Sequence, residues 1–535
     1  MQRTVKLVLF SGLFAGGFVA ACVGDDPGSE GGSDAGGSAE TSTVADTSTN
    51  EDGGASCEPG KTACGTECFD LKTNDEHCGT CEKKCSAGFK CVDGDCGDSV
   101  VKVAGNFNHA CALMKNGSLY CWGGNDYGQL GKAPSPSDPI CVEKNGTKHS
   151  CNPKPSVVPN ISDVVDVSSG ATDFTCVIKK DGTVWCWGRN QHGQVGTVDI
   201  ECAVPAADGG VGAPTRCNPS PQQMVIPGVP MQTKAKAFGV SAATGCVLLE
   251  NGEVHCWAFN DGSRAGIPLE SPTTTPLDFR LHPPTKVAFP FEAGPMVRIH
   301  ASSGLNTTCA TASNGKLWCW GKGHVGQVAR LPSTVGPAGC QYCTPTPAPA
   351  EDTDGGAMQD IVQSATTTAT CVRRTDQSIW CFGNNASGEL GLGTTDALSG
   401  DNAHYKPSKV TAVPATAELF AQYNQFFATD TVGDVWIWGE NRYGTLGDGT
   451  TGGSACQNGR LACVLTPKKN PALAGMVQIS PGSSAVVARK NDGTVWAWGA
   501  NTQGQLGHTP QTAGDINLCS DDLPCNPTPS KVTIP

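Results

Sequence analysis

Short apolar stretches separated by glycine-containing turns fill most of the chain, and they lack the periodicity of an amphipathic helix. One of them, CVIKKDGTVWCWGRNQHGQVG, runs from Cys176 to Gly196. Its pattern opposes Cys176 to Cys186 across a three-residue loop that ends at Gly182. Such loops combine a type I turn with a final residue in the left-handed conformation, usually Gly. The stretch therefore predicts an antiparallel hairpin.

This hairpin recurs seven times. Its second aromatic residue falls at Trp122, Trp187, Trp257, Trp320, Phe382, Trp438 and Trp498. A regular recurrence of this kind is typical of repeat proteins. One strand such as DVVDVSS precedes each hairpin and one such as PSKVTI follows it, so each repeat supplies about four strands. We therefore expect an all-β, seven-bladed β-propeller over residues 97–535. Its repeats should begin near residues 99, 162, 233, 296, 358, 417 and 475.

The hairpin cysteines are present or absent only in pairs. Five copies carry both: Cys111–Cys121, Cys176–Cys186, Cys246–Cys256, Cys309–Cys319 and Cys371–Cys381. The other two copies carry neither. Directly opposed residues in a non-hydrogen-bonded pair have Cα atoms about 4.5 Å apart, which suits a disulfide. We therefore predict five cross-hairpin disulfides rather than redox or metal sites.

The insertions that follow the hairpins hold further cysteines close together in sequence. We predict the local disulfides Cys141–Cys151, Cys202–Cys217, Cys340–Cys343, Cys456–Cys463 and Cys519–Cys525. Residues 57–96 contain eight more cysteines and few large apolar residues, so disulfides must stabilise this small module. The spacing of Cys78 and Cys81 also allows zinc, but disulfides are favoured in an exported protein. The pairing within the module stays open.

The run DEHCGTCEKKCSAGFKCVDGDC within that module resembles stigma-specific-protein-like cysteine-rich modules, which are extracellular. This resemblance covers residues 57–96 alone and implies disulfides rather than a ligand. After all these pairs, Cys22 is the one odd residue among 29 cysteines.

The N-terminus indicates export. Arg3 and Lys6 precede a 15-residue apolar run, so residues 1–21 are predicted to be a signal peptide. The end of that run, FVAAC, resembles the lipobox of bacterial lipoproteins, which implies lipidation of Cys22. Ordinary secretion is the alternative, but it leaves a free thiol. Val23 follows the cysteine where an inner-membrane lipoprotein would have Asp, which favours the outer membrane or cell surface of a Gram-negative bacterium.

Residues 22–56 are acidic and rich in Gly, Ser and Thr, so we predict a disordered tether with a reach of about 32 Å. The net charge of −13 and the lack of a basic run argue against a nucleic-acid partner. The only predicted membrane attachment is the lipid on Cys22, and we expect a monomer.

The strand VxxVxxG, the hairpin DGxVxxWGxNxxGQLG and the closing PxxV strand resemble the regulator-of-chromosome-condensation repeat family over residues 99–535. The likeness is specific in copies one, two, five and seven, whereas copies three (WAFNDGSRAG) and four (WGKGHVGQVA) are degraded. The resemblance implies seven blades. The best-known member exchanges nucleotide on a nuclear GTPase, an activity that we do not expect of an exported protein. Secreted bacterial members inhibit β-lactamases by binding with one face.

All eleven tryptophans fall in two columns that flank the second hairpin cysteine. Tyr120, His255 and Phe382 fill the remaining places in these columns. Residues two apart on a strand share a face, so the rings should form one apolar surface opposite the disulfide. An exposed aromatic row could bind sugars. A row repeated in every copy fits core packing between repeats better. Ring closure should bring Val100–Val103 next to Lys531–Ile534.

Catalytic motifs are scarce. Residues 321–326 spell GxGxxG, but a repeat lacks the strand–turn–helix unit that this dinucleotide motif needs. We find no GxxxxGK[ST], HExxH or GxSxG. We therefore predict a protein that is not an enzyme, with no catalytic residue, metal or cofactor.

Insertions share one position in every repeat, at residues 132–154, 197–220, 263–283, 329–345, 393–406, 447–467 and 508–527. They should form one broad rim that binds a protein or glycan partner. The alternatives are an extracellular hydrolase or lyase in the channel, an enzyme-inhibitor-like propeller, and a structural surface-layer role.

Overall fold

The structure is a computed structural model. It describes residues 57–85, 91–92, 94–96, 99–143, 146–170, 172–196, 200–202, 215–230, 232–240, 243–260, 263–267, 282–301, 307–330, 342–396, 404–456, 461–512, 514–516, 519 and 523–535. The predicted signal peptide, the tether and Cys22 lie outside these ranges. Within them, no helix combines the length and the apolarity that crossing a membrane requires.

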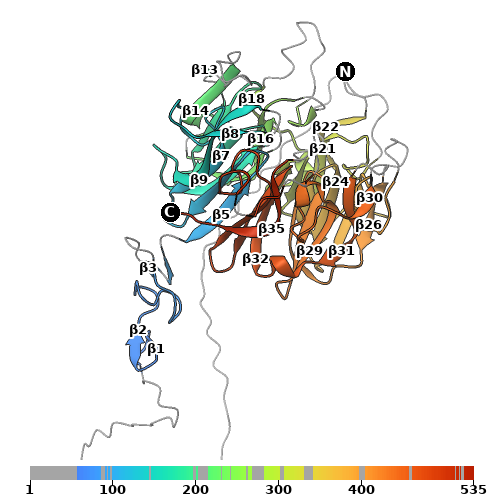
Figure 1. Cartoon of the computed structure of the whole chain (residues 1–535). Helices are drawn as coiled ribbons and strands as arrows, with labels where there is room; N and C mark the ends of the chain where they lie inside the picture. The colour runs from blue at the N-terminus through green and yellow to red at the C-terminus, as the bar shows by residue number, and fades with distance from the viewer. Residues whose placement is uncertain are drawn as a thin grey trace, which may run out of the picture. The chain divides into compact units, whose positions relative to one another are not determined.

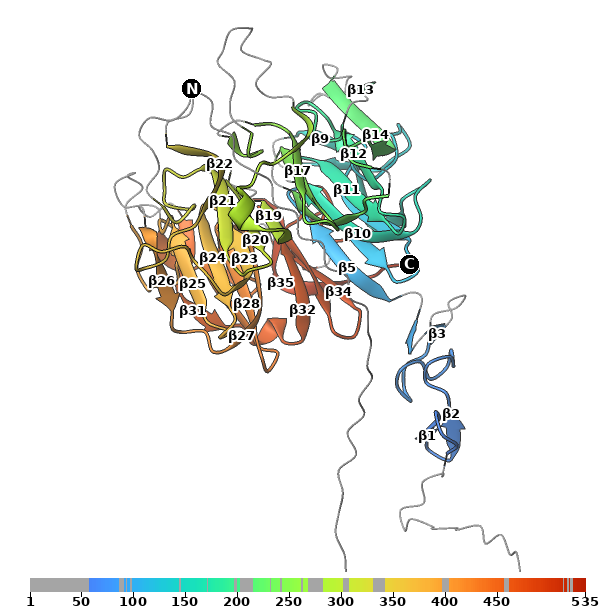
Figure 2. The same cartoon turned by 180° about the vertical axis from the view of Figure 1, so that it is seen from behind.

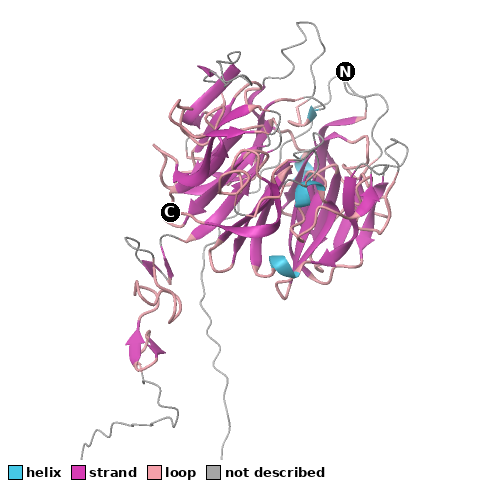
Figure 3. Cartoon of the chain, viewed as in Figure 1, coloured by secondary structure: helices cyan, strands magenta, loops and turns pink. Residues whose placement is uncertain are grey.

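Seven antiparallel sheets of four or five strands follow one another along residues 100–532, and strands dominate the fold (Figure 3). We call the first four strands of each blade A to D, from the channel outward. The A strands are β5 (Val100–Gly105), β10 (Val164–Gly170), β15 (Ala235–Val240), β19 (Met296–Ala301), β23 (Ile361–Thr366), β27 (Thr416–Gln422) and β32 (Met476–Pro481). The B strands are β6 (His109–Met114), β11 (Phe174–Lys179), β16 (Thr244–Leu249), β20 (Thr307–Ala312), β24 (Ala369–Arg374), β28 (Gln425–Asp430) and β33 (Ala485–Lys490).

The outer half of each blade has the same regularity. The C strands are β7 (Leu119–Gly124), β12 (Val184–Arg189), β17 (Val254–Ala258), β21 (Leu317–Lys322), β25 (Ile379–Gly383), β29 (Val435–Glu440) and β34 (Val495–Ala500). The D strands are β9 (Lys148–Val157), β14 (Thr215–Met224), β18 (His282–Lys286), β22 (Cys343–Pro349), β26 (His404–Val410), β31 (Leu461–Lys469) and β35 (Cys525–Val532). Blades 1, 2 and 6 add β8 (Ile140–Val142), β13 (Ile200–Cys202) and β30 (Ser454–Cys456) beyond strand D. Among the described residues, short 3₁₀ turns lie at η3 (Phe291–Ala293), η5 (Arg442–Gly444) and η6 (Pro471–Leu473). The predicted all-β, seven-bladed propeller is confirmed.

The small N-terminal module contains two pairs of short strands. β1 (Thr62–Cys64) pairs with β2 (Glu67–Phe69), and β3 (Cys91–Val92) pairs with β4 (Asp95–Cys96). The pairing that the sequence left open is Cys57–Cys68, Cys64–Cys81, Cys78–Cys91 and Cys85–Cys96. Cys78 and Cys81 thus belong to different disulfides.

The B–C hairpins have the predicted register. Cys176 lies directly opposite Cys186, and their Cα atoms are 4.1 Å apart. The residue that closes the loop has a positive φ in all seven copies, including Gln377 at 67° in the fifth. The left-handed turn is therefore kept even where a glycine is missing.

Nine of the ten predicted propeller pairs are disulfides in the structure. They are Cys111–Cys121, Cys141–Cys151, Cys176–Cys186, Cys202–Cys217, Cys246–Cys256, Cys309–Cys319, Cys371–Cys381, Cys456–Cys463 and Cys519–Cys525. Cys343 is also disulfide-bonded, and its predicted partner Cys340 lies outside the described residues.

The second aromatic column forms the core between blades. Its seven side chains are fully buried. The indole N–H of each of its six tryptophans donates to a main-chain oxygen of the preceding blade, as from Trp187 to Gln129 at 2.9 Å. In blade 5 the column holds Phe382, and the equivalent oxygen of Gln327 accepts from the Thr370 hydroxyl instead. Each blade is therefore joined to the one before it by the same packing and the same acceptor.

The first aromatic column is only partly core, which corrects the expectation that all these rings are buried. Trp185, Trp380, Trp436 and Trp496 are half-buried. A lysine or arginine lies over three of them, as Lys490 does over Trp496 at 4.4 Å. These rings stand near the hairpin turns, at the second residue of strand C. The cations cover ring surface that a stacked sugar would use.

Ring closure brings Val100 and Val103 into one core cluster with Val532 and Ile534, as expected, although these strands do not pair with each other. β5 pairs with β6 and β35 with β34, so the first and last strands belong to different sheets. Figures 1 and 2 both show β5 beside the strands of the last blade. The Gln478 amide of blade 7 accepts from Val103 N and donates to Val103 O, both at 3.0 Å. Side chains thus bond the free edge of β5, and the ring closes by packing of whole blades.

Candidate functional site at the channel mouth

The seven A strands enclose a central cavity of about 280 Å³. Phe238 and Phe420 line it together with His300. Burial lowers the pKa of His300 to about 4, so its imidazole is neutral. Lys102 of β5 and Asp166 of β10 form an ion pair across neighbouring blades at this level. The channel is therefore a mixed polar and aromatic space rather than a charged one.

One end of the channel carries all seven insertions. Consecutive strands of each blade are antiparallel, so the A–B loops and the C–D connections lie at the same end. Every predicted insertion begins after strand C and ends within strand D, so it includes the C–D connection of its blade. We call this end the insertion face and the opposite end the hairpin face. The prediction that all insertions leave their blades on one side of the propeller is therefore confirmed.

A ring of mostly polar residues surrounds the channel at the insertion face. Each stands directly before a B strand, and the described members are Asn108, Asp173, Ala243, Thr368, Asn424 and Ser484. Their main-chain oxygens accept from the residue that ends or follows strand C, at 2.7 to 3.2 Å. This bond fixes each residue at the same height in its blade. We call the ring the collar.

The collar is most polar where blades 1 and 2 meet. Asn108 Nδ2 donates to Asp173 Oδ1 at 3.2 Å, and Arg189 lies 4.0 Å from the same carboxylate. Burial raises the pKa of Asp173 to about 6, although Arg189 and Asn108 oppose the shift. The Arg189 guanidinium also lies 4.9 Å from the centre of the Tyr127 ring. This segment presents a buried acid beside an arginine–aromatic pair.

The insertion of blade 1 is fixed beside this segment. His149 Nδ1 lies 2.7 Å from Asp126, and its Nε2 lies 3.3 Å from Glu143. Burial lowers the pKa of His149, but the hydrogen bonds and charges of Asp126 and Glu143 outweigh it and raise the pKa to about 9. The insertion is therefore held by an imidazolium between two carboxylates at neutral pH.

The collar has a second polar segment where blades 5 and 6 meet. The Thr368 hydroxyl lies 2.7 Å from Asn424 Oδ1 and 3.2 Å from Glu389 Oε1. Asn424 Nδ2 donates to Glu440 Oε2 at 2.9 Å. Burial raises the pKa of Glu389 to about 7 and raises the pKa of Glu440. Burial raises the pKa of Tyr423, the neighbour of Asn424, and the charge of Asp173 adds to the shift, so the two segments lie within electrostatic reach of each other.

Chemically, the mouth offers hydrogen-bond donors and acceptors, buried acids, and aromatic side chains at its edge. Phe107, beside Asn108, is 44% exposed. Its main-chain oxygen accepts from the Ser484 hydroxyl at 3.0 Å. Phe107 thus presents an exposed aromatic side chain from a hydrogen-bonded backbone, which suits recognition of a partner. The acids are engaged by Asn108, Arg189 and Thr368.

Sequence reasoning missed the collar, although its signal is simple. Each member precedes the first hairpin cysteine position by three residues, as Asp173 precedes Cys176 and Thr368 precedes Cys371. Sequence reasoning also missed that Glu389 replaces the glutamine of the GQxG segment. Gly321–Gly326, the weak dinucleotide motif, begins at the end of strand β21 and continues into turns, as expected for a repeat.

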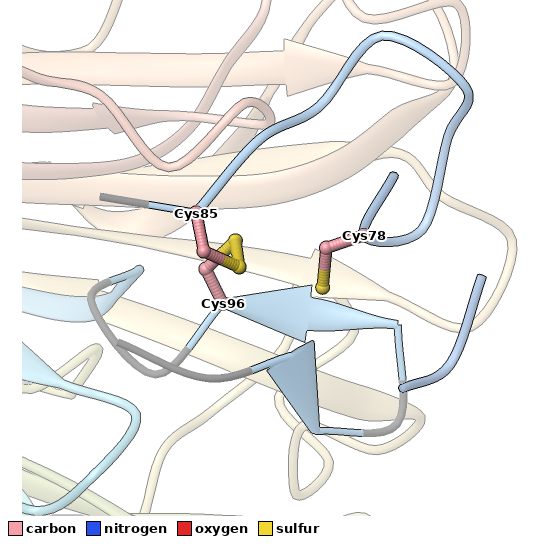
Figure 4. A group of neighbouring side chains, drawn as sticks. All are labelled: Cys78, Cys85 and Cys96. Atoms are coloured by element: carbon pink, nitrogen blue, oxygen red, sulfur yellow. A yellow bond between two sulfur atoms is a disulfide. The ribbon is translucent and has the colours of Figure 1, made fainter. Parts of the chain in front are cut away.

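One cysteine cluster has the spacing of a metal site. The sulfurs of Cys78, Cys85 and Cys96 all lie within 4.8 Å of one another. Figure 4 shows Cys85 joined to Cys96 with Cys78 beside them, and Cys78 is bonded to Cys91. Zinc needs thiolates. The bonded sulfurs therefore make this a stapled core rather than a metal centre.

Comparison with known proteins agrees with the fold. Two sequence profiles of the "Regulator of chromosome condensation (RCC1) repeat" match the chain, one over residues 100–129, 164–194, 299–327 and 476–505, the other over 116–178, 181–232, 432–489 and 492–535. The profiles therefore match the fourth copy, in which we expected a degraded repeat. They do not match the fifth copy, in which we expected a specific one.

Curated relatives include the E3 ubiquitin-protein ligase HERC2 of Homo sapiens, 24% identical over 73% of this chain. The chain spans only 7% of the length of that ligase. The ultraviolet-B receptor UVR8 of Arabidopsis thaliana is 22% identical, over 76% of this chain and 78% of the receptor.

Solved structures give the same architecture. Human WBSCR16 has a TM-score of 0.58 at 19% identity and covers 78% of this chain and 94% of its own. Prp20p of Saccharomyces cerevisiae has a TM-score of 0.60 at 17% identity and covers 79% and 87%. The protein therefore carries regulator of chromosome condensation repeats, folded as a seven-bladed β-propeller.

Proposed function

We propose that this protein is a non-catalytic, exported lipoprotein whose propeller binds a protein partner through the insertion face. One observation carries the proposal: all seven insertions leave their blades at the same end of the channel. Disulfides brace four of them within the described residues: Cys141–Cys151, Cys202–Cys217, Cys456–Cys463 and Cys519–Cys525. When a loop becomes ordered on binding a partner, free energy is lost. Disulfides that already restrain the loop reduce this loss.

The chemistry of this face suits a protein partner. Tyrosine, arginine and other aromatic residues are enriched in protein interfaces. Tyr127, Arg189 and Phe107 supply them at the collar, and Arg442 lies over Tyr443 at 4.9 Å on the far side. Prp20p, whose structure was described with its binding to Gsp1p and histones, has the same fold, which supports a protein-binding role. A glycan partner has less support, because cations lie over three of the four half-buried tryptophans.

Attachment is part of the same proposal. A lipid on Cys22 anchors the chain to the outer membrane or cell surface, and the acidic segment 22–56 lets the folded part reach a partner. The partner in this proposal is not a nucleic acid. The propeller acts as a monomer. A hydrolase or lyase at the channel mouth is the second candidate, because Asp173 keeps a proton up to about pH 6.

Site-specific photo-crosslinking tests the proposal. A photoreactive residue replaces Phe107, Ile140 or Leu392 on the insertion face, and Val225 or Val432 serves as the matched control on the hairpin face. All five side chains are at least 38% exposed. We expect the insertion-face variants to label one shared protein in whole cells. Equal labelling from the hairpin face would contradict the proposal.

A further inference from the structure

We propose that the central channel binds a small neutral sugar, a single ring of monosaccharide size that carries several hydroxyl groups. The site is the cavity of about 280 Å³ inside the propeller, and residues of all seven A strands line it. It is separate from the surface that the insertions form. The inference therefore does not depend on the proposed protein partner.

The cavity exists because the fifth residue of strand A is small in four neighbouring blades. In every blade this residue pairs with the first hairpin cysteine position, as Ser168 pairs with Cys176. The fifth residue is small in blades 7, 1, 2 and 3 and large in blades 4 and 6. In that order, the six are Ser480, Ala104, Ser168, Gly239, His300 and Phe420, and all of them line the cavity. Ala365, their counterpart in blade 5, is not part of the lining. A large side chain in blades 7 to 3 would fill this space.

Nearer the hairpin face, the polar side chains of the lining join one blade to the next. Lys102 forms the ion pair with Asp166, and the amides of Gln363 and Gln478 bond the main chain of the following blade. Lys102 is the only Lys, Arg, Asp or Glu among the described lining residues, and Asp166 neutralises it. A charged ligand would be buried without a counter-charge, which is costly, so the cavity favours a neutral ligand.

Farther along the channel, four polar side chains of the lining have no hydrogen-bond partner among the described residues. They are Ser168, Ser169, His300 and Gln422. Ser169 is only 8% exposed, and its hydroxyl oxygen is buried. Burial lowers the pKa of His300 to about 4, so its imidazole is neutral and offers one donor and one acceptor. Enclosed polar groups need partners, and here a ligand with several hydroxyl groups can supply them.

Phe238 and Phe420 give the same cavity apolar walls. Both are half-buried: each packs against a core cluster with part of its side chain and lines the channel with the rest. Water alone could fill the cavity, which has room for about nine molecules at about 30 Å³ each. Water would bond the polar groups but would leave the phenyl rings hydrated. A sugar ring bonds the polar groups through its hydroxyls and covers the phenyl rings with its C–H face.

Titration calorimetry of the full chain with D-glucose, D-galactose and D-mannose tests the proposal. We expect at least one of these sugars to bind saturably, with a dissociation constant of about 1 mM or below. Ser168→Phe places in blade 2 the residue that blade 6 has at the same position, so it should fill the cavity within a side-chain pattern that the repeat already contains. This variant should weaken binding at least about tenfold and keep the wild-type melting temperature. If none of the sugars binds, or if binding survives this substitution, the channel holds water alone and the proposal is wrong.

His300→Phe gives a second test that does not rely on filling the space. It keeps a ring of similar size and removes both ring nitrogens, so sugar binding should again weaken at least about tenfold. In the wild type, the nitrogen NMR signals of the His300 imidazole should shift as the sugar saturates the site. Phe107→Ala is the control, because it removes an aromatic side chain from the insertion face, outside the cavity lining. Equal weakening in the control, or His300 signals that do not move at saturation, would overturn the proposal.

Discussion

Trp122 of the first blade donates its indole N–H to the main-chain oxygen of Gln505 in the last blade at 3.0 Å. The same bond joins blade 2 to blade 1, from Trp187 to Gln129 at 2.9 Å. The first and last repeats are therefore joined by the contact that neighbouring repeats use. The ring therefore closes without a sheet that combines strands from the two ends of the chain.

Replacement of Trp122 by Phe should keep the packing and remove this bond. Because the Gln505 oxygen is buried in the core, its loss should cost about 1–3 kcal/mol of unfolding free energy. Denaturant unfolding measures the difference. Trp185→Phe is the control, because Trp185 is half-buried and bonds within its own hairpin to Thr183. A larger loss in the control would contradict the closure described above.

Gln377 occupies the left-handed turn position with φ of 67°, where the other six hairpins have Gly. That conformation costs a non-glycine residue about 1–2 kcal/mol, and the extra freedom of Gly when unfolded offsets part of it. Gln377→Gly should therefore stabilise the protein by up to about 1 kcal/mol.

Gly433 provides the matched control for that turn. Its φ is 88°, and a Cβ there would meet nothing within 4 Å. Gly433→Ala should therefore destabilise the protein by about 1 kcal/mol through backbone conformation alone. If both substitutions shift the melting temperature in the same direction, the turn assignment is wrong.

The Cys176–Cys186 disulfide should stabilise its hairpin by about 2–3 kcal/mol. Blade 7 has Val487 and Ala497 at the same two positions. The double change Cys176→Val and Cys186→Ala should therefore leave the fold intact and lower the melting temperature. Circular dichroism during heating checks both points, and loss of the β-sheet spectrum at room temperature would contradict the expectation.

His149 should make the blade 1 insertion sensitive to alkaline pH. Its folded pKa, about 9, lies above its ordinary value of 6.5. The stabilisation is therefore complete below 6.5 and is lost as the pH rises through about 9. His149→Gln should lower the melting temperature at pH 6 and have a much smaller effect at pH 10. An equal effect at both values would show that the imidazolium does not hold the insertion.

Cys22→Ser tests the anchor. The wild-type chain should incorporate a fatty-acid analogue and sediment with membranes, whereas the variant should do neither. If the variant is still labelled, Cys22 is not the modified residue.

The repeat itself could be predicted from the sequence because its determinants are local. Cys176, Cys186 and Gly182 lie within one hairpin, and comparison of seven copies fixed their register. Trp187 was placed in the core because the same column recurs in each copy. The insertions were placed on one face by the same comparison, since a shared position in a repeat means a shared position in every blade.

The channel mouth could not be predicted in the same way. Asp173 and Tyr423 belong to blades 2 and 6, and only the curvature of the ring brings them near each other. The bond from Gln478 to Val103 likewise depends on how the ring closes. Such contacts form between residues of different repeats, and no fixed spacing in the sequence predicts them.

The insertion-face account is tested most directly by the affinity of the chain for the partner that photo-crosslinking identifies. Phe107→Ala removes an exposed aromatic side chain from the channel mouth, and Val432→Ala shortens an even more exposed side chain on the hairpin face. Titration calorimetry should show affinity at least about tenfold weaker for Phe107→Ala, since an anchor residue contributes more than about 1.4 kcal/mol. Val432→Ala should bind like the wild type. Undiminished binding by Phe107→Ala, or weakened binding by Val432→Ala, would contradict the account.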